Sequence, residues 1–189
     1  QDALNASQRE STKTSYLPQI GTNFTSDATY PANISQTDPR TGKPYGIEGW
    51  RNPTIPYPGG ATPESCAPPY SFSTSRSPTR CAFDYASVSD TIPGYETANV
   101  LGRLTWDIRA DTQFFVEGSY YRGKFTQLIS PTPVQGANTP TPMTLPASSP
   151  YYPTAYVAGQ DGGRTDLPLV LQSRTLELGP RVDVTNVDQ

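Results

Sequence analysis

The chain has 189 residues, among them 21 prolines, 15 glycines and 12 tyrosines, and only 16% of its residues are charged, against an average of about 25%. Low charge with many aromatic residues argues against ordinary disorder, and a net charge of −3 indicates no attraction to nucleic acids or to anionic membranes. The lack of histidine excludes the usual Ser/His/Asp and Cys/His catalytic arrangements, and no apolar run reaches the ~18 residues of a transmembrane helix.

Residues 1–97 are expected to form a strand end followed by a long disulfide-containing loop. A short helical or strand-end segment is expected around residues 3–10. The first residue, Gln1, is not Met, which predicts a processed product or an internal piece of a longer protein. Turn signals such as Asn52-Pro53 and Pro58-Gly59-Gly60 predict one long irregular tract over residues 21–93.

The two cysteines, Cys66 and Cys81, are separated by 14 residues rich in proline and serine. A zinc site at this pair would lack ligands because the chain has no histidine, and no other metal or cofactor is indicated. We therefore predict a disulfide, which implies an oxidising compartment. Two buried free thiols are the alternative.

The segment 98–125 is expected to be a transmembrane-type β-hairpin, because apolar and polar residues alternate along both of its strands. The apolar series is Ala98, Val100, Gly102, Leu104, Trp106 and Ile108 in the first strand, and Phe114, Val116, Gly118 and Tyr120 in the second. Each strand is close to the ~9–11 residues that cross a bilayer. An amphipathic hairpin of a soluble β-sandwich is the alternative.

A three-residue loop, 110–112, is predicted for this hairpin because an odd loop length pairs apolar with apolar residues. It would place Trp106 opposite Val116, and Thr105 opposite Glu117. The aromatic residues then fall near both ends of the hairpin, which is typical of the girdles of an outer-membrane barrel.

Residues 126–172 are expected to form a second long, proline-rich loop, and residues 173–189 the start of the next strand. Alternation resumes over residues 174–184, where Pro180 marks a bulge or a strand edge because it cannot donate to a ladder. The chain therefore has a turn of three residues on one side and loops of more than forty residues on the other. Outer-membrane barrels have the same asymmetry, with short periplasmic turns and longer extracellular loops.

Three segments carry a resemblance to a known family. The hairpin, in segments 101–106 and 115–120, resembles a barrel hairpin of TonB-dependent outer-membrane receptors. The loop 145–153 resembles an extracellular loop of that family, and the segment 174–181 resembles the strand that follows it. The resemblance is to an Oar-like branch of the family, with long proline-rich loops. The resemblance implies an all-β fold of antiparallel transmembrane β-barrel strands with long irregular extracellular loops, in the bacterial outer membrane. It covers residues 75–185 well and residues 1–74 loosely, and the chain holds only part of such a barrel.

Aromatic residues of the loops are the candidate ligand-binding residues. Those considered for stacking on a ligand at a receptor mouth are Trp50, Tyr57, Tyr70, Tyr151 and Tyr152. The alternative is that tyrosine and proline pack on one another to order the loops. No enzymatic activity is predicted, since carboxylates such as Asp107 and Glu117 are expected to be solvated or to point into a barrel lumen.

Two functions of different class remain open. The first is a segment of a TonB-dependent receptor that takes up a scarce nutrient; its implied partners are the remainder of the barrel, outer-membrane lipid and the TonB system, which acts through a plug domain that this chain lacks. The second is an extracellular β-rich structural module whose strand edges pair with further copies, as in a filament.

Overall fold

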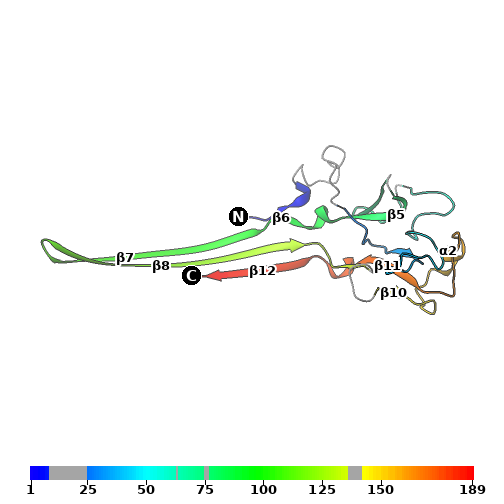
Figure 1. Ribbon diagram of the computed structural model, residues 1–189. Helices are drawn as coiled ribbons and strands as arrows, with labels where there is room; N and C mark the ends of the chain where they lie inside the picture. The colour runs from blue at the N-terminus through cyan, green and yellow to red at the C-terminus, as the bar shows by residue number, and fades with distance from the viewer. Residues whose placement is uncertain (9–24, 63, 75–76, 136–141) are drawn as a thin grey trace.

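The computed structural model describes residues 1–8, 25–62, 64–74, 77–135 and 142–189, and antiparallel strands dominate this part of the chain. The predicted all-β class is therefore confirmed, and the described strands form open sheets. Figure 1 shows a long, narrow sheet that extends from a compact region of short strands and loops, which we call the loop region (residues 25–92 and 130–178, as described).

The long sheet has three strands in the order β12-β8-β7, with β7 (Gly94–Arg109) and β8 (Thr112–Ile129) joined as a hairpin and β12 (Arg181–Asp188) on the other side of β8. The remaining strands are β1 (Leu4–Asn5), β2 (Thr25–Ser26), β3 (Asn33–Ser35), β4 (Ser71–Thr74), β5 (Ser77–Asp84), β6 (Asp90–Ile92), β9 (Pro133–Gln135), β10 (Thr144–Leu145) and β11 (Leu169–Arg174). The helical pieces are short: α2 (Thr154–Ala158) and the 3-10 turns Ala6–Gln8, Tyr85–Val88 and Leu176–Leu178.

Backbone hydrogen bonds extend the long sheet at both sides. Gln1 exchanges two with Tyr95 on the outer side of β7, at 2.8 and 2.9 Å, in the same register as the pairing of Leu4 in β1 with Ile92 in β6. Gln189 exchanges two with Tyr121 of β8, at 2.9 and 3.0 Å. The N-terminal segment, β7, β8 and β12 thus lie side by side in chain order and alternate in direction, as in an up-and-down meander.

The predicted loop of the hairpin is wrong by one residue, and the register by two. The turn is the pair Ala110-Asp111, and an irregularity between Asp107 and Arg109 leaves one extra residue in β7. This bulge supplies the odd residue that the predicted loop would have supplied, so apolar residues still face apolar residues. Trp106 lies opposite Phe114 rather than Val116.

The observed register also places Arg103 opposite Glu117, and their side chains form an ion pair at 2.9 Å. The predicted register would have put Thr105 opposite Glu117 and separated these charges.

The described parts of the two predicted irregular tracts contain short strands that pair with one another, which corrects the expectation of one long irregular tract over residues 21–93. Leu171 of β11 pairs with Ile34 of β3, and β5 lies between β2 and β4. A small core joins both tracts and consists of Ile34, Ile47, Tyr152, Val157 and Leu169. Short strands suffice here because they bury their apolar side chains against a second loop rather than within a large sheet.

The expected strand over residues 174–184 is wrong in its first half. Leu176–Leu178 is a 3-10 turn and Gly179 has a φ of 73°, in the left-handed region that favours glycine. Strand β12 begins directly after Pro180, where the missing N–H of proline removes no ladder hydrogen bond. At the N-terminus, Leu4–Asn5 and Ala6–Gln8 match the expected short segment, and its last residues, 9 and 10, lie outside the described part.

Candidate functional site

One face of the long sheet carries a continuous apolar surface, which we call the apolar belt. It consists of Ala98, Val100, Gly102, Leu104 and Trp106 in β7, and Phe114, Val116, Gly118 and Tyr120 in β8. Its large side chains are exposed, from 49% for Tyr120 to 70% for Leu104. Exposed apolar patches of this extent mark a surface that is covered by a membrane or a protein.

The opposite face of the same strands, the polar face, is hydrogen-bonded and charged. In addition to the Arg103–Glu117 pair, Gln113 Nε2 donates to Asp107 Oδ1 at 2.7 Å. Opposite the belt Phe115 interrupts this face, and the guanidinium of Arg103 lies over its ring at 4.8 Å from the centroid. Leu101, on the same face, is 78% exposed, and nearer the loop region this face also carries Phe125, opposite Tyr95. The sheet is therefore apolar on one side and polar on the other, as predicted from the alternation.

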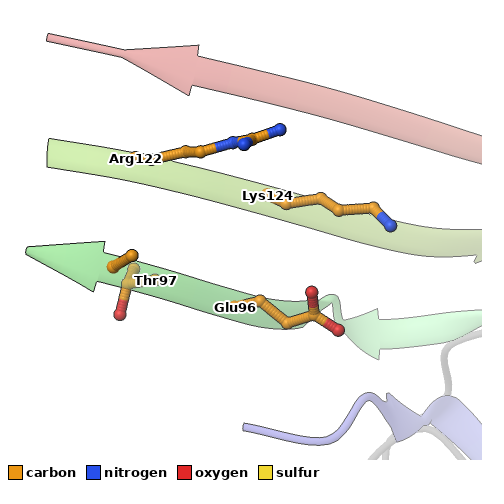
Figure 2. A pocket seen from close by; sticks show the side chains of 5 residues that line it. Glu96, Thr97, Arg122 and Lys124 are labelled. Atoms are coloured by element: carbon orange, nitrogen blue, oxygen red, sulfur yellow. The ribbon is translucent and has the colours of Figure 1, made fainter.

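A row of charged residues ends the apolar belt on the side of the loop region. This charged row consists of Glu96 in β7, Arg122 and Lys124 in β8, and Asp188 in β12. Glu96 lies opposite Lys124, and Arg122 lies between Ala98 and Asp188, with its Nε 3.8 Å from Asp188 Oδ1. Figure 2 shows Glu96, Arg122 and Lys124 beside a depression of about 390 Å³ that residues of β7 and β8 line.

The charged row was not predicted as a site, because the predicted apolar series of the second strand ends at Tyr120. A signal was present: the same alternation continues through positions 122 and 124, where the side chains become basic.

The predicted disulfide is confirmed: Cys66 and Cys81 are bonded, and both are fully buried. Asn33 holds the strand that carries Cys81, because its side-chain amide donates to Cys81 O at 2.9 Å and its Oδ1 accepts from Cys81 N at 3.0 Å. Asn52 Nδ2 donates to the same Oδ1 at 3.0 Å. The disulfide therefore fastens the first loop tract to β5, and through Asn33 to β3.

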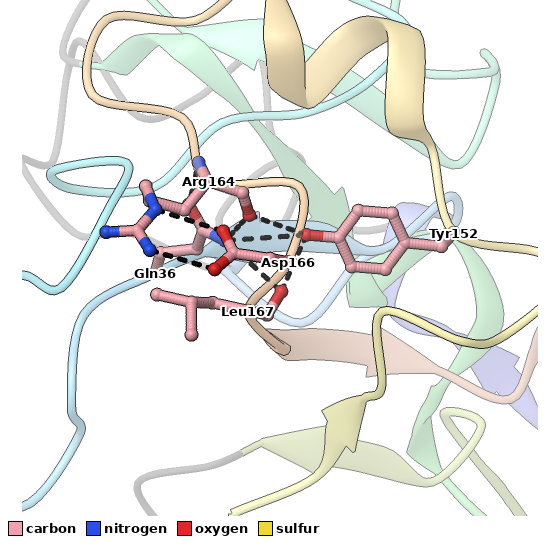
Figure 3. Close-up of polar contacts among 5 residues, drawn as sticks. All are labelled: Gln36, Tyr152, Arg164, Asp166 and Leu167. Carbon is pink, nitrogen blue, oxygen red and sulfur yellow. Dashed lines mark hydrogen bonds and ion pairs between the residues drawn. The ribbon is translucent and has the colours of Figure 1, made fainter.

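A second buried polar group, Gln36, joins the two loop tracts (Figure 3). Gln36 is fully buried, and its Oε1 accepts from Arg164 N at 2.9 Å and from Ile47 N at 3.1 Å. Its Nε2 donates to Arg164 O at 2.5 Å. Tyr152, a candidate ligand residue, belongs to the same cluster: it is 7% exposed and its hydroxyl donates to Leu167 O at 2.7 Å. Tyr152 thus orders the loops, which is the packing role held open for it.

Arg174 is a buried cation at the junction of the loop region and the long sheet. Its Nη1 donates to Pro131 O at 2.7 Å and to Ser130 Oγ at 2.9 Å, just after β8 ends, and its Nε donates to Ala28 O at 3.2 Å. The guanidinium lies 4.5 Å from the centroid of the Phe83 ring. Burial, together with the charge of Arg181, lowers the pKa of Arg174 to about 10, which leaves it protonated at neutral pH.

We expect Arg174→Lys to lower the free energy of unfolding by about 1–2 kcal/mol, because an ammonium cannot reach three acceptors and stack on a ring at once. The matched control is Arg164→Lys, whose side chain is 55% exposed in its pair with Asp166 and should change stability by less than about 0.5 kcal/mol. Urea denaturation followed by tryptophan fluorescence measures both. Equal effects of the two changes would contradict the stabilising role that we assign to the buried contacts of Arg174.

The other candidate ligand residues are placed separately. Tyr57 is 36% exposed and its hydroxyl donates to Asp161 Oδ2 at 2.5 Å, a contact that raises the pKa of Tyr57. Tyr151 is 86% exposed, Tyr70 is 37% exposed, and Trp50 is partly buried with its backbone carbonyl bonded to Thr79. Tyr57, Tyr70 and Tyr151 therefore present aromatic surface, and Tyr152 does not.

Within the described ranges, no group of three or more His, Cys, Asp or Glu side chains could hold a metal ion. None of the helices that the structure describes has the length and apolar character needed to cross a bilayer.

Comparison of the chain with protein-family models, with curated proteins and with solved structures finds no match.

Proposed function

We propose that this chain forms part of a β-barrel of the bacterial outer membrane and, by the resemblance given above, a segment of a TonB-dependent receptor that takes up a scarce nutrient. The observation that carries the proposal is the exposed apolar belt on one face of a sheet whose other face is charged. This is the pattern of a barrel strand, with lipid outside and a polar lumen inside.

The dimensions of the apolar surface support this proposal. The apolar belt extends from Ala98 to Trp106 in β7, about 27 Å along a strand that rises about 3.4 Å per residue. At a strand tilt of about 40° this length corresponds to about 21 Å of bilayer, within a few ångströms of the ~25 Å apolar band of outer-membrane barrels. The charged row follows at the next positions, where headgroups would begin.

The strand order supports it as well. Consecutive neighbours that alternate in direction are the arrangement of membrane barrels, and three strands cannot close one. The proposal therefore requires partner strands beside β7 and β12 from the remainder of the receptor barrel. The loop region then lies on the extracellular side, where exposed Tyr57 and Tyr151 would meet ligand, and the TonB system would act through a plug domain.

A second candidate function is a self-associating extracellular β-rich module. It is favoured by the outer edge of β7 beyond the Tyr95 pair, which none of the described strands covers from Glu96 to the turn. An uncovered edge of this length is a template for a further copy of the chain. In this case the apolar belt would be buried between copies rather than in lipid.

The length of the native gene product and its need for detergent, measured on protein from its source membrane, distinguish the receptor segment from the self-associating module. A receptor segment predicts a heat-modifiable polypeptide several times longer than this chain, recovered only with detergent. A 20.5 kDa chain that assembles in water without detergent would overturn the receptor proposal and support the second function. Single cysteines at Leu104 and Thr105 carrying an environment-sensitive dye add a readout, since only position 104 should report hydrocarbon.

A further inference from the structure

The charged row has an asymmetry that the barrel proposal alone does not explain. Its two cations, Arg122 and Lys124, are neighbours on the same face of the central strand β8, whereas the acidic residues lie on the flanking strands. Among the described residues, Lys124 forms no ion pair, and Arg122 reaches Asp188 only at 3.8 Å. Arg122 and Lys124 thus stand side by side, each opposite an acidic residue, and only Arg122 comes within ion-pair distance of its acidic neighbour among the described residues.

The surroundings of these cations are suited to an anion at a membrane surface. The side chain of Arg122 is 65% exposed, Lys124 is exposed, and both border the depression of about 390 Å³ between β7 and β8, which Glu96 lines on the side of β7. Directly towards the turn lies the apolar belt, whose nearest aromatic residue, Tyr120, donates from its hydroxyl to Asp188 at 3.4 Å. A ligand here would contact the apolar belt on the side of the hairpin turn and the two cations on the side of the loop region.

We infer that Arg122 and Lys124 bind the phosphate of an anionic lipid headgroup at the end of the apolar belt nearest the loop region. The inference rests on the proposed membrane location of the sheet. A lipid fits both halves of the surface, because its acyl chains cover the belt while its phosphate accepts hydrogen bonds from the guanidinium and ammonium groups. A soluble anion would use only the cations and leave the belt exposed.

Flotation of the full 189-residue chain with lipid vesicles tests the inference. One set of vesicles contains phosphatidylcholine alone, and the other contains phosphatidylglycerol as well. We expect the double variant R122Q/K124Q to bind the anionic vesicles about tenfold more weakly than the unchanged chain, and to bind neutral vesicles equally well. The matched control is R40Q/K43Q, which removes the same charge from exposed residues of the loop region and should change neither affinity by more than about twofold.

The outcomes separate this inference from the proposed function. Binding to neutral vesicles combined with no selective loss in R122Q/K124Q would overturn the phosphate site and leave the membrane location intact. A loss of equal size in R40Q/K43Q would also overturn it, because the effect would then follow net charge rather than position. If the unchanged chain binds neither kind of vesicle, the membrane location itself fails, and the lipid site with it.

Discussion

Replacing Cys66 and Cys81 by serine is expected to lower the free energy of unfolding of the loop region by about 3 kcal/mol, since the disulfide closes a loop of 15 residues. The effect should be large here because the loop region has only a small apolar core. Cys66 and Ala67 also adopt positive φ values of 72° and 50°, a conformation that non-glycine residues hold only when their surroundings enforce it.

Urea denaturation measures this effect, with Trp50 as the reporter in a Trp106→Phe background, so that the signal comes from the loop region alone. The control is built into the pair of proteins: a reductant should shift the midpoint of the parent and leave the double serine variant unchanged. A parent whose midpoint does not move on reduction would show that the disulfide contributes nothing to the order of these loops.

The hairpin was predictable because its information is local. A side-chain period of two determines which residues share a face, and the structure keeps the predicted apolar series together from Ala98 to Trp106 and from Phe114 to Tyr120, whereas Ile108 falls in the bulge and loses its predicted partner Phe114. The register was not predictable in the same way. A three-residue loop and a two-residue loop with a bulge both pair apolar with apolar residues, and the choice between them falls to pairs such as Arg103–Glu117.

The loop region was poorly predictable because long-range contacts order it. Gln36 bonds to Arg164, 128 residues away, and Arg174 bonds to Ala28, 146 residues away. A buried glutamine or arginine carries no local mark that distinguishes it from an exposed one. The disulfide was predictable for the opposite reason: two cysteines without histidine leave few alternatives, and the pairing needed no knowledge of the fold.

Leu104→Arg should produce the largest loss of membrane binding in the chain. Leu104 lies in the middle of the apolar belt, opposite Val116, and is 70% exposed. If the belt faces lipid, an arginine here enters the bilayer near its midplane, where it costs about 2–4 kcal/mol in barrel strands. Flotation with phosphatidylcholine vesicles should therefore show a binding constant reduced by a factor on the order of 30 or more.

The matched control is Thr105→Arg, one residue along the same strand and on the polar face, opposite Phe115. Strand propensity, chain position and added charge are nearly the same in both variants, so their difference isolates the face. We expect Thr105→Arg to change vesicle binding by less than about 0.5 kcal/mol. Equal losses in both variants would mean that added charge, not lipid contact, weakens binding. If Leu104→Arg binds vesicles normally but fails to assemble in water, the belt is buried between copies of the chain, and the sheet is a building block rather than a barrel wall.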